Sequence, residues 1–182
     1  IKQDPVSIEN IEKNIVETAF AKGWIHPEPP LRRTEKKVAV VGSGPAGLAA
    51  AQQLNRAGHW VTVFERDEKP GGLLRFGIPD FKMEKSVIDR RLIILREEGI
   101  RFKCGVHVGK DLPVATLQED YDAVLLCGGA TVRRGLPIPG AALQGVVQAM
   151  DFLAQNNRKV ADVPFEGAPI DARGKHVIVI GG

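Results

Sequence analysis

Three glycines, Gly42, Gly44 and Gly47, constrain the fold of this chain more than any other feature of its sequence. They follow a short apolar run, Val38 to Val41, and precede an Ala- and Leu-rich stretch that continues to Ala57. A wholly apolar run of this kind is typical of a central parallel strand that is covered on both faces. A strand, a glycine turn and a helix in this order predict the start of a βαβ unit that binds a dinucleotide.

An acidic residue stands where such a unit requires one. A second apolar run, Trp60 to Phe64, follows the predicted helix after Gly58, and Glu65 stands at its carboxyl end, about 20 residues beyond the glycines. Because a β-α-β crossover is right-handed, the two runs are predicted to be parallel neighbours in one sheet. The carboxylate of Glu65 is then placed to accept hydrogen bonds from both hydroxyls of an adenosine ribose. It would repel a 2′-phosphate, so NADP is not expected at this site.

Each glycine of the turn has a predicted mechanical role. Gly42 allows the sharp change of direction, Gly44 leaves the backbone open to a pyrophosphate, and Gly47 lets the helix pack closely on the strands. Pro45 suits the first helical turn, where a missing N–H costs little. The helix N-terminus presents unpaired N–H groups and a positive dipole end to the phosphates. A glycine turn that merely packs, without a ligand, is the alternative interpretation of the same spacing.

The rest of the chain continues the alternation of helices and strands. The expected elements are a glycine-rich loop from Pro70 to Pro79, a helix from Glu84 to Glu98, a short strand from Ile100 to Cys104, a brief helical turn from Val114 to Leu117, a buried strand from Asp122 to Cys127 and a helix around Val147 to Ala154. Residues 156 to 175 are expected to form a loop or linker. The sequence therefore predicts the α/β class, with a Rossmann-like domain on a central parallel sheet.

The N-terminal part of the chain is expected to be an attachment to this domain. Asp4-Pro5 and Ser7 are helix-start signals, and apolar residues then recur at helical spacing until Gly23. A stiff proline-rich stretch, His26 to Pro30, follows it. The basic run from Arg32 to Lys37 is interpreted as a solvated linker, with a nucleotide phosphate or an acidic partner as the alternative contact.

The last residues, Lys175 to Gly182, repeat the order of basic residue, apolar run and glycine turn found from Lys37 to Gly42. This repeat predicts that Val177 to Ile180 form the first strand of a second nucleotide-binding unit, and that the chain is a fragment of a longer polypeptide. A terminal edge strand with a glycine tail is the alternative. The expected organisation is a helix and linker over 1–36, an incomplete dinucleotide-binding domain over 37–173, and the start of a second one over 174–182.

Composition narrows the function classes. The formal net charge of +3 is too weak a basic balance to predict nucleic-acid binding. No apolar run approaches the ~18 residues of a membrane span, and the first ten residues lack the features of a secretory signal. Cys104 and Cys127 form neither a CxxC pair nor a four-thiolate cage, so no metal ligands are expected. They are interpreted as reduced cysteines of a cytoplasmic protein.

From the glycine turn onward, the chain resembles the two-dinucleotide-domain flavoproteins, in which this turn binds FAD. The resemblance rests on residues 41–51, on 58–66, on the pair Gly71-Gly72, and on the strand and small residues of 122–130. Residues 71–91 narrow the resemblance to the small (β) subunit of bacterial glutamate synthase and the equivalent region of NADH-dependent glutamate synthase. Dihydropyrimidine dehydrogenase and other ferredoxin-linked NAD(P)H flavoproteins share the architecture and stay open as alternatives. So does a nucleotide-binding fragment without redox activity.

The resemblance also implies which residues contact FAD. The glycine turn meets the pyrophosphate, Glu65 meets the adenosine ribose, and the loop after Glu65 lines the ribityl and ring end. The implied contacts are Gly42, Ser43, Gly44, Pro45, Ala46, Gly47, Glu65, Arg66, Gly72, Leu73, Arg75, Ile78, Pro79, Val108, Cys127, Gly128, Gly129 and Ala130. For Arg66 the alternative to cofactor contact is a surface ion pair, and for Arg75 the alternative to phosphate contact is an ion pair at a domain interface. No catalytic acid or base is implied, because the flavin carries the chemistry.

In that family, by resemblance, NAD(P)H bound in a second Rossmann-like domain gives a hydride to FAD. Electrons then pass singly to iron–sulfur clusters and on to the large subunit, where glutamate forms. This chain lacks the family's cluster-ligating cysteines, most of the NAD(P)H domain and a later segment that completes the FAD domain. The resemblance therefore implies a glutamate synthase large subunit as partner of the longer protein. We expect this polypeptide alone to be inactive and to hold FAD weakly.

Overall fold

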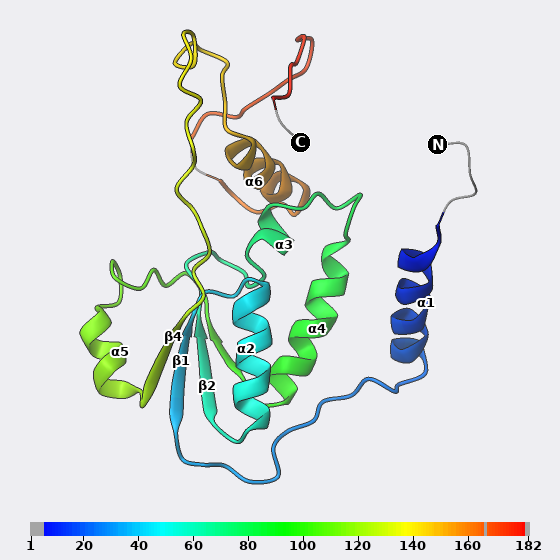
Figure 1. Cartoon of the computed structure of the whole chain (residues 1–182), viewed down its shortest axis with the longest axis vertical. Helices are drawn as coiled ribbons and strands as arrows, with labels where there is room; N and C mark the ends of the chain where they lie inside the picture. Colours follow the sequence, from blue (N-terminus) through cyan, green and yellow to red (C-terminus); the bar gives the residue numbers. More distant parts are fainter. Residues whose placement is uncertain (1–5, 166, 181–182) are drawn as a thin grey trace.

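The computed structural model describes residues 6–165 and 167–180. Its elements are α1 (Ile8–Ala21), β1 (Lys37–Val41), α2 (Pro45–Arg56), β2 (Trp60–Phe64), α3 (Leu73–Phe76), α4 (Lys85–Glu97), β3 (Arg101–Lys103), α5 (Val114–Asp120), β4 (Ala123–Leu126) and α6 (Ala149–Val160) (Figure 1). The helix-start pair Asp4-Pro5 and the glycines at 181 and 182 lie outside the described residues. No described helix is long and apolar enough to cross a membrane.

The strands form one parallel sheet in the order β3-β2-β1-β4. In the register of the sheet, Val40 of β1 stands between Val63 of β2 and Leu125 of β4. The chain moves outward from β1 to β2 and β3, then returns to place β4 on the other side of β1. This arrangement confirms the predicted α/β fold with a central parallel sheet, and α1 is the predicted N-terminal helical segment.

The main core lies between one face of the sheet and the helices α2 and α4 (Figure 1). Val40 and Val63 are fully buried there, and Leu92 and Leu95 of α4 pack against them. These helix residues lie three apart, which places them on one side of α4. The opposite face of the sheet has a much smaller buried cluster, formed around Phe64 and two other residues. Burial is therefore strongly one-sided, and α2 begins at the carboxyl end of β1, on this buried side of the sheet.

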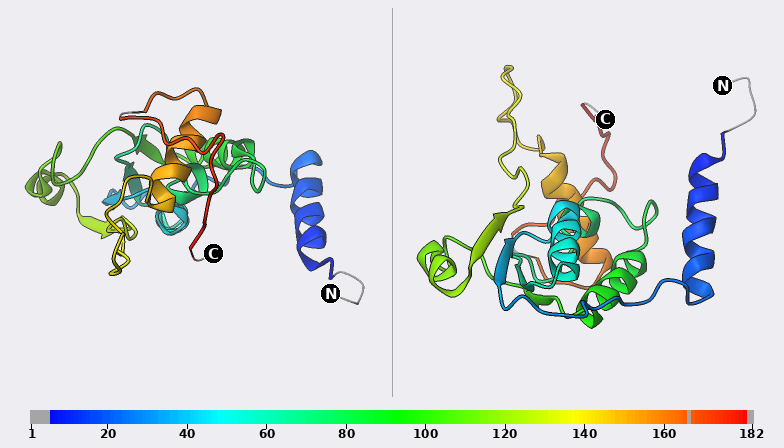
Figure 2. Two further views of the ribbon diagram at one scale, coloured as in Figure 1. Left: turned by 90° about the horizontal axis from the view of Figure 1, so that it is seen from above. Right: turned by 60° about the horizontal axis from the view of Figure 1, so that its bottom comes forward.

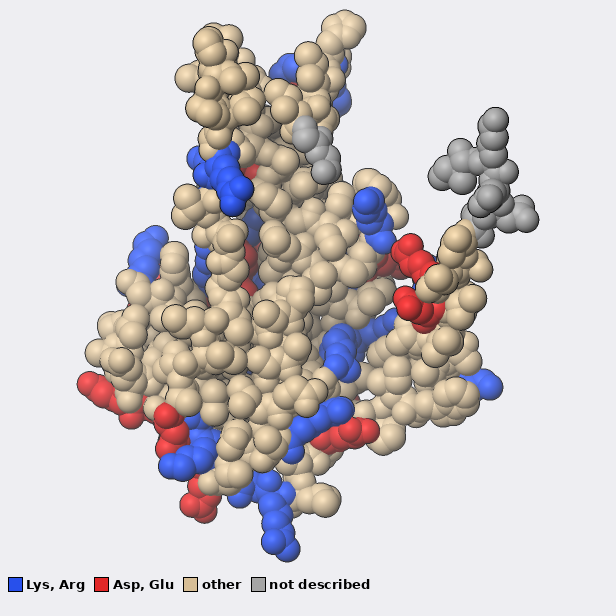
Figure 3. Space-filling model, in the orientation of Figure 1, with Lys and Arg blue, Asp and Glu red and all other residues tan. Residues whose placement is uncertain are grey.

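Helix α1 stands apart from the body of the molecule in both views of Figure 2. One arginine of α4 attaches it. Arg90 donates hydrogen bonds to both carboxylate oxygens of Glu17 at 2.6 Å, and its guanidinium lies 4.0 Å from the ring centre of Phe20. Bidentate pairing of this kind fixes geometry as well as contributing free energy. On the face drawn in Figure 3, lysines and arginines are interspersed with acidic side chains.

The segment between α1 and β1 corrects one expectation. Arg33 was predicted to belong to a solvated linker, yet it is half-buried and donates to Asn55 Oδ1 and to the His59 carbonyl, each at 2.8 Å. Its guanidinium also lies 4.3 Å from the ring centre of Trp60. The physical reason is that the carboxyl end of a helix and the following turn expose carbonyl oxygens, which a guanidinium satisfies. The linker is therefore docked along the molecule at this point.

Three further expectations differ from the structure. The strand predicted as buried is an exposed edge strand, with Leu126 of β4 77% exposed, because the sheet has no neighbour beyond it among the described residues. Helix α6 extends to Val160, through residues predicted as loop. Val177–Ile180 form no strand and are exposed, because no described strand pairs with them. An apolar run forms a strand only where a neighbouring strand is present to pair with it.

Candidate functional site

The glycine turn lies at the carboxyl edge of the sheet, where β1 passes into α2. Gly42 has φ +104°, and its N–H donates to the Phe64 carbonyl at 2.8 Å, which continues the sheet pairing by one residue. β1 is also the strand at which the order of the sheet reverses direction, because β2 and β4 lie on its two sides. In open α/β sheets ligands bind outside the carboxyl ends of the strands at such a switch point.

Two of the glycines are required by close contacts within the protein. A Cβ atom at Gly42 would lie 2.4 Å from the Cys127 carbonyl oxygen, and one at Gly47 would lie 2.0 Å from the Gly42 carbonyl oxygen. Neither distance is possible for real atoms without movement of the backbone. The predicted roles of Gly42 in the turn and of Gly47 in close packing therefore agree with the geometry. Gly47 packs against two groups, the backbone of the glycine turn and the Cys127 side chain.

Gly44 differs, because nothing lies within 4 Å of the position that its Cβ would take. It is the N-cap residue of α2, its φ of −65° is open to any residue, and no side chain caps the helix. Pro45 occupies the first helical turn. The first backbone hydrogen bond of the helix runs from the Leu48 N–H to the Gly44 carbonyl, at 2.9 Å. The preceding N–H groups of the first turn are available to a ligand, and the helix dipole favours an anion there.

The Glu65 carboxylate lies next to this turn and is buried, with 5% of the residue exposed. Its Oε2 accepts a hydrogen bond from the Ser43 N–H at 3.0 Å and another from the Ser43 hydroxyl. Its Oε1 accepts the Asp67 N–H at 2.9 Å. Each carboxylate oxygen has two acceptor positions, so Oε1 keeps one for a further donor. Hydrogen bonds from the glycine turn thus hold the Glu65 carboxylate in place beside the predicted pyrophosphate site.

Ser43 connects this acid to the glycine-rich loop that follows it. Its hydroxyl, wholly buried, donates to Glu65 and accepts the Gly71 N–H at 3.0 Å. Gly72 has φ +53°, and a Cβ there would lie 2.9 Å from the Gly44 Cα atom. Hydrogen bonds of Ser43 therefore join the glycine turn, the acid and Gly71, and Gly72 packs directly on Gly44. We call this unit, Ser43, Gly44, Glu65, Gly71 and Gly72, the serine junction.

The two arginines with competing interpretations behave differently. Arg75 is 6% exposed, donates from Nε to the Pro70 carbonyl at 2.6 Å, and forms an ion pair with Asp89 of α4. The structure therefore gives Arg75 an ion pair with α4, while its predicted contact with a phosphate stays a prediction. Arg66 is exposed beside Glu65 and has no ion pair with a described residue. Its predicted contact with the cofactor stays a prediction.

The other predicted contacts lie around the same edge of the sheet or beside it. The Cys127 N–H donates to the Val41 carbonyl at 2.7 Å, which carries the backbone of β4 past the turn. Nothing lies within 4 Å of a Cβ built at Gly128 or Gly129, and Ala130 is exposed. Leu73 is 59% exposed. Ala46 follows Pro45 at the start of α2, and the Ile78 and Pro79 carbonyls accept hydrogen bonds from Lys85 Nζ and the Lys82 N–H.

Val108 lies on the other side of the sheet. It pairs with Leu112 in an isolated bridge and packs against the small cluster around Phe64. The structure therefore gives its side chain a packing role, and a contact through its backbone stays a prediction. Burial raises the pKa of the Cys104 thiol, and the Glu65 charge acts in the same direction. This agrees with the interpretation of that cysteine as an unreactive thiol.

Sequence reasoning missed a contact by which α6 holds the loop that follows Glu65. Arg158 of α6 forms ion pairs with Asp67 at 3.0 Å and Glu68 at 3.2 Å, and its guanidinium lies 4.3 Å from the ring centre of Phe76. Burial and the Glu65 charge raise the pKa of Asp67, against the effect of Arg158. No local pattern pointed to this contact, because its partners are about 90 residues apart along the chain.

The parallel sheet, its switch point and the serine junction define an α/β dinucleotide-binding protein. Residues 36–182 match the family model described as pyridine nucleotide-disulphide oxidoreductase, and the chain belongs to this family. It is similar over its whole length to glutamate synthase small chains, which confirms the resemblance drawn from the sequence. It is 58% identical to the glutamate synthase (NADPH) small chain of Mycobacterium tuberculosis and 51% identical to that of Bacillus subtilis.

The chain spans 38% and 37% of the length of these two relatives. It is also 49% identical to part of a glutamate synthase (NADH) of Schizosaccharomyces pombe, of which it spans 9%. Among solved structures, FprA of Mycobacterium tuberculosis in complex with NADPH superposes with a TM-score of 0.62. The two are 33% identical, and the match covers 68% of this chain and 29% of FprA. The likeness therefore extends to the architecture of an oxidoreductase.

Proposed function

We propose that this chain binds FAD at the serine junction and is the FAD-binding part of an NAD(P)H-dependent glutamate synthase small subunit. The observation that carries the proposal is the bare backbone at Gly44, which stands at the start of α2 beside a buried acid. The pyrophosphate takes the first-turn N–H groups of α2, and the free acceptor position of Glu65 Oε1 takes a ribose hydroxyl. No neighbouring side chain occupies the space at Gly44.

FAD is favoured over NAD by the loop that packs on the turn. The contact between Gly72 and Gly44 brings the residues after it, Leu73 onward, to the same edge of the sheet. A ligand that extends beyond its pyrophosphate on this side meets that loop. Glu65 disfavours a 2′-phosphate, so the NADPH named for the bacterial relatives is proposed to bind elsewhere in the longer protein.

When bound, FAD takes two electrons together as a hydride and releases them one at a time. The residues of this chain bind and orient it. Ser43 fixes the carboxylate of Glu65, the α2 N-terminus neutralises part of the phosphate charge, and Gly128 and Gly129 leave space at the rim. We propose that the longer protein passes these electrons from NAD(P)H to iron–sulfur clusters and to a glutamate-forming large subunit in the cytoplasm.

The proposed division of the chain follows the same logic. Residues 1–36 form the helix and linker, 37–173 the FAD-binding domain, and 174–182 the start of the NAD(P)H-binding domain. On this proposal Val177–Ile180 join a sheet when the strands of that domain are present to pair with them. The exposure of these four apolar side chains supports a partner for them, because burial of such a run removes a large apolar area from water.

Titration of the purified chain with FAD, followed by quenching of flavin fluorescence, tests the proposal. Gly44→Val places a branched side chain where the pyrophosphate is proposed to lie, and it is expected to abolish binding without unfolding the chain. Gly135→Val is the matched control, since nothing lies within 4 Å of its added Cβ and its φ is unrestricted. Saturable binding of NAD with no binding of FAD would overturn the cofactor assignment. Equal FAD affinity in the two variants would move the site elsewhere.

A further inference from the structure

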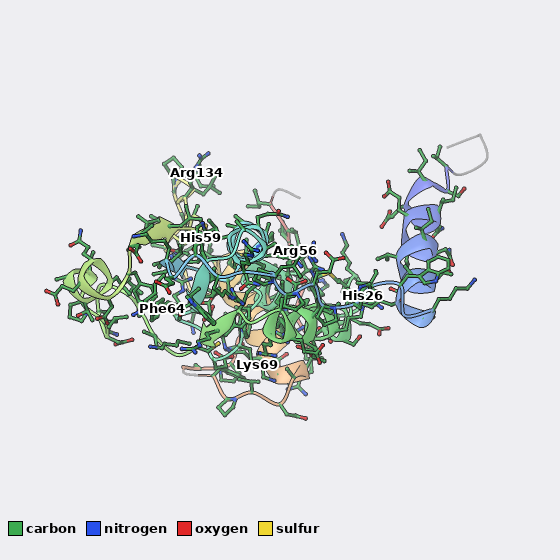
Figure 4. All side chains as sticks on the ribbon, turned by 90° about the horizontal axis from the view of Figure 1, so that it is seen from below. His26, Arg56, His59, Phe64, Lys69 and Arg134 are labelled. Atoms are coloured by element: carbon green, nitrogen blue, oxygen red, sulfur yellow. The ribbon has the colours of Figure 1, made fainter. Side chains whose placement is uncertain are left out.

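A second cavity lies away from the serine junction, between the loop before α3, the start of α4 and helix α6. Its volume is about 200 Å³. The lining residues are Lys69, Arg75, Phe76, Asp80, Lys85, Asp89, Asn157, Ala161 and Val163. Figure 4 shows Lys69 on the side of the molecule where α6 lies. The cavity is several times larger than the space that one water molecule occupies in the liquid, about 30 Å³.

One polar group in this cavity has no partner. Asn157 of α6 is 4% exposed, and its Nδ2 makes no hydrogen bond with any described residue. Buried amide groups are almost always hydrogen-bonded, because an unpaired one loses its hydrogen bonds to water without replacing them. An amide nitrogen only donates, so what completes the site must supply an acceptor.

The charges of the lining residues leave one cation over. Arg75 pairs with Asp89, and Lys85 pairs with Asp80 at 3.2 Å while donating to the Ile78 and Met83 carbonyls. These two pairs satisfy both acids of the cavity. Lys69, whose side chain reaches solvent, forms no ion pair within the described part of the chain.

We propose that this cavity binds a small oxyanion, phosphate or a carboxylate, between Lys69 and Asn157. Asn157, with its unpaired amide donor, and Lys69, with its uncompensated positive charge, line the same cavity. The Nδ2 atom is itself buried, so the proposal includes a turn of the Asn157 amide toward the cavity, where an anion with several acceptor oxygens satisfies both groups. The open side at Lys69 gives it a path from solvent. None of its lining residues belongs to the serine junction, and Arg75, which is also among the implied FAD contacts, is held by Asp89, so this site is independent of the proposed pyrophosphate and ribose contacts.

The test uses inorganic phosphate with the purified chain, and sodium chloride at matched ionic strength as the reference. Two-dimensional NMR follows the Asn157 side-chain amide, whose signals are expected to shift and saturate. Acetate in a parallel titration separates a carboxylate from a tetrahedral anion as the preferred ligand. Saturation by either supports the proposal, and saturation by neither overturns it.

Matched variants locate the effect. Asn157→Leu and Asn156→Leu change neighbouring positions of α6, one buried in the cavity and one exposed. Phosphate is expected to raise the melting temperature of the Asn156→Leu protein as it does that of the unmodified chain, and to leave that of Asn157→Leu unchanged. Asn157→Leu removes an unpaired donor, so it is expected to fold.

The charge is tested with a second pair. Lys69→Gln is expected to weaken phosphate binding about tenfold, the ratio that corresponds to ~1.4 kcal/mol. Lys159→Gln, which changes an exposed lysine of α6 outside the cavity, is expected to leave it unchanged. Equal phosphate affinity in all four variants would show that phosphate binds outside this cavity, and the proposal would be wrong.

Discussion

Replacement of Ser43 by alanine tests whether the serine junction holds the site together. The hydroxyl makes two hydrogen bonds, one donated to the Glu65 carboxylate and one accepted from the Gly71 N–H at 3.0 Å. The change leaves the Gly71 N–H buried without a partner, which costs about 1–3 kcal/mol, and removes one bond to a charged group, worth about 1.5–3 kcal/mol. Because the Ser43 N–H still holds Glu65, the smaller values apply, and we expect a total loss of about 2.5 kcal/mol.

Urea denaturation followed by circular dichroism measures this loss as a change in the free energy of unfolding at constant m-value. Ser86→Ala is the matched control, because Ser86 is exposed and its hydroxyl lies 3.4 Å from the Glu84 carboxylate. A surface change of this kind shifts stability by less than about 0.5 kcal/mol. The FAD affinity of Ser43→Ala is expected to fall as well, since Glu65 and Gly71 lose their common anchor. Equal stability of the two variants would show that the Ser43 hydrogen bonds do not hold the serine junction together.

Three further changes test other parts of the structure. Arg33→Ala removes three hydrogen bonds, to Asn55, His59 and Glu98, and the contact with Trp60. It should lower the urea-derived free energy of unfolding by about 2–3 kcal/mol. A loss below about 0.5 kcal/mol would mean that the linker is not docked. Burial raises the pKa of Glu98, but hydrogen bonds from Arg56 and Gln52 outweigh it, and the folded pKa lies below the ordinary 4.5. The ionised Glu98 therefore stabilises the fold above pH 4.5, and this stabilisation is lost as the pH falls through the folded pKa. The urea midpoint should fall less steeply with decreasing pH in Glu98→Gln than in the unmodified chain. Parallel curves of midpoint against pH for the two proteins would contradict this role. Gly47→Ala, whose Cβ would meet the turn at 2.0 Å, should destabilise by about 1–3 kcal/mol in the same assay, and an unchanged midpoint would contradict the close packing.

The sequence predicted the parts of the fold that local chemistry dictates. Gly42 and Gly47 stand at positions where a side chain would collide with backbone, so only glycine is compatible with the turn. The strand before them, β1, is apolar because it is central in the sheet. Glu65 follows the carboxyl end of β2, the neighbouring strand. These features lie within about 30 residues, the length of one βαβ unit. That is why the dinucleotide site was recognisable before the structure.

Contacts between distant segments were not predictable from such patterns. Arg158 reaches Asp67 from α6, and Arg33 reaches the end of α2 from the linker. Neither residue stands in a distinctive local pattern, because an arginine on a polar helix or in a basic run is usually solvated. Leu126 shows the same limit in reverse: its run is apolar enough for a buried strand, but the tertiary structure leaves it at the edge.

A crystal structure of the chain with bound FAD tests the central proposal most directly. The account predicts that the pyrophosphate lies against the Gly44 backbone, within hydrogen-bond distance of the Ala46 or Gly47 N–H. It also predicts a ribose hydroxyl on Oε1 of Glu65, with the Ser43 hydrogen bonds intact. FAD bound at another edge of the sheet, or a Glu65 side chain turned away from the ribose, would contradict the account.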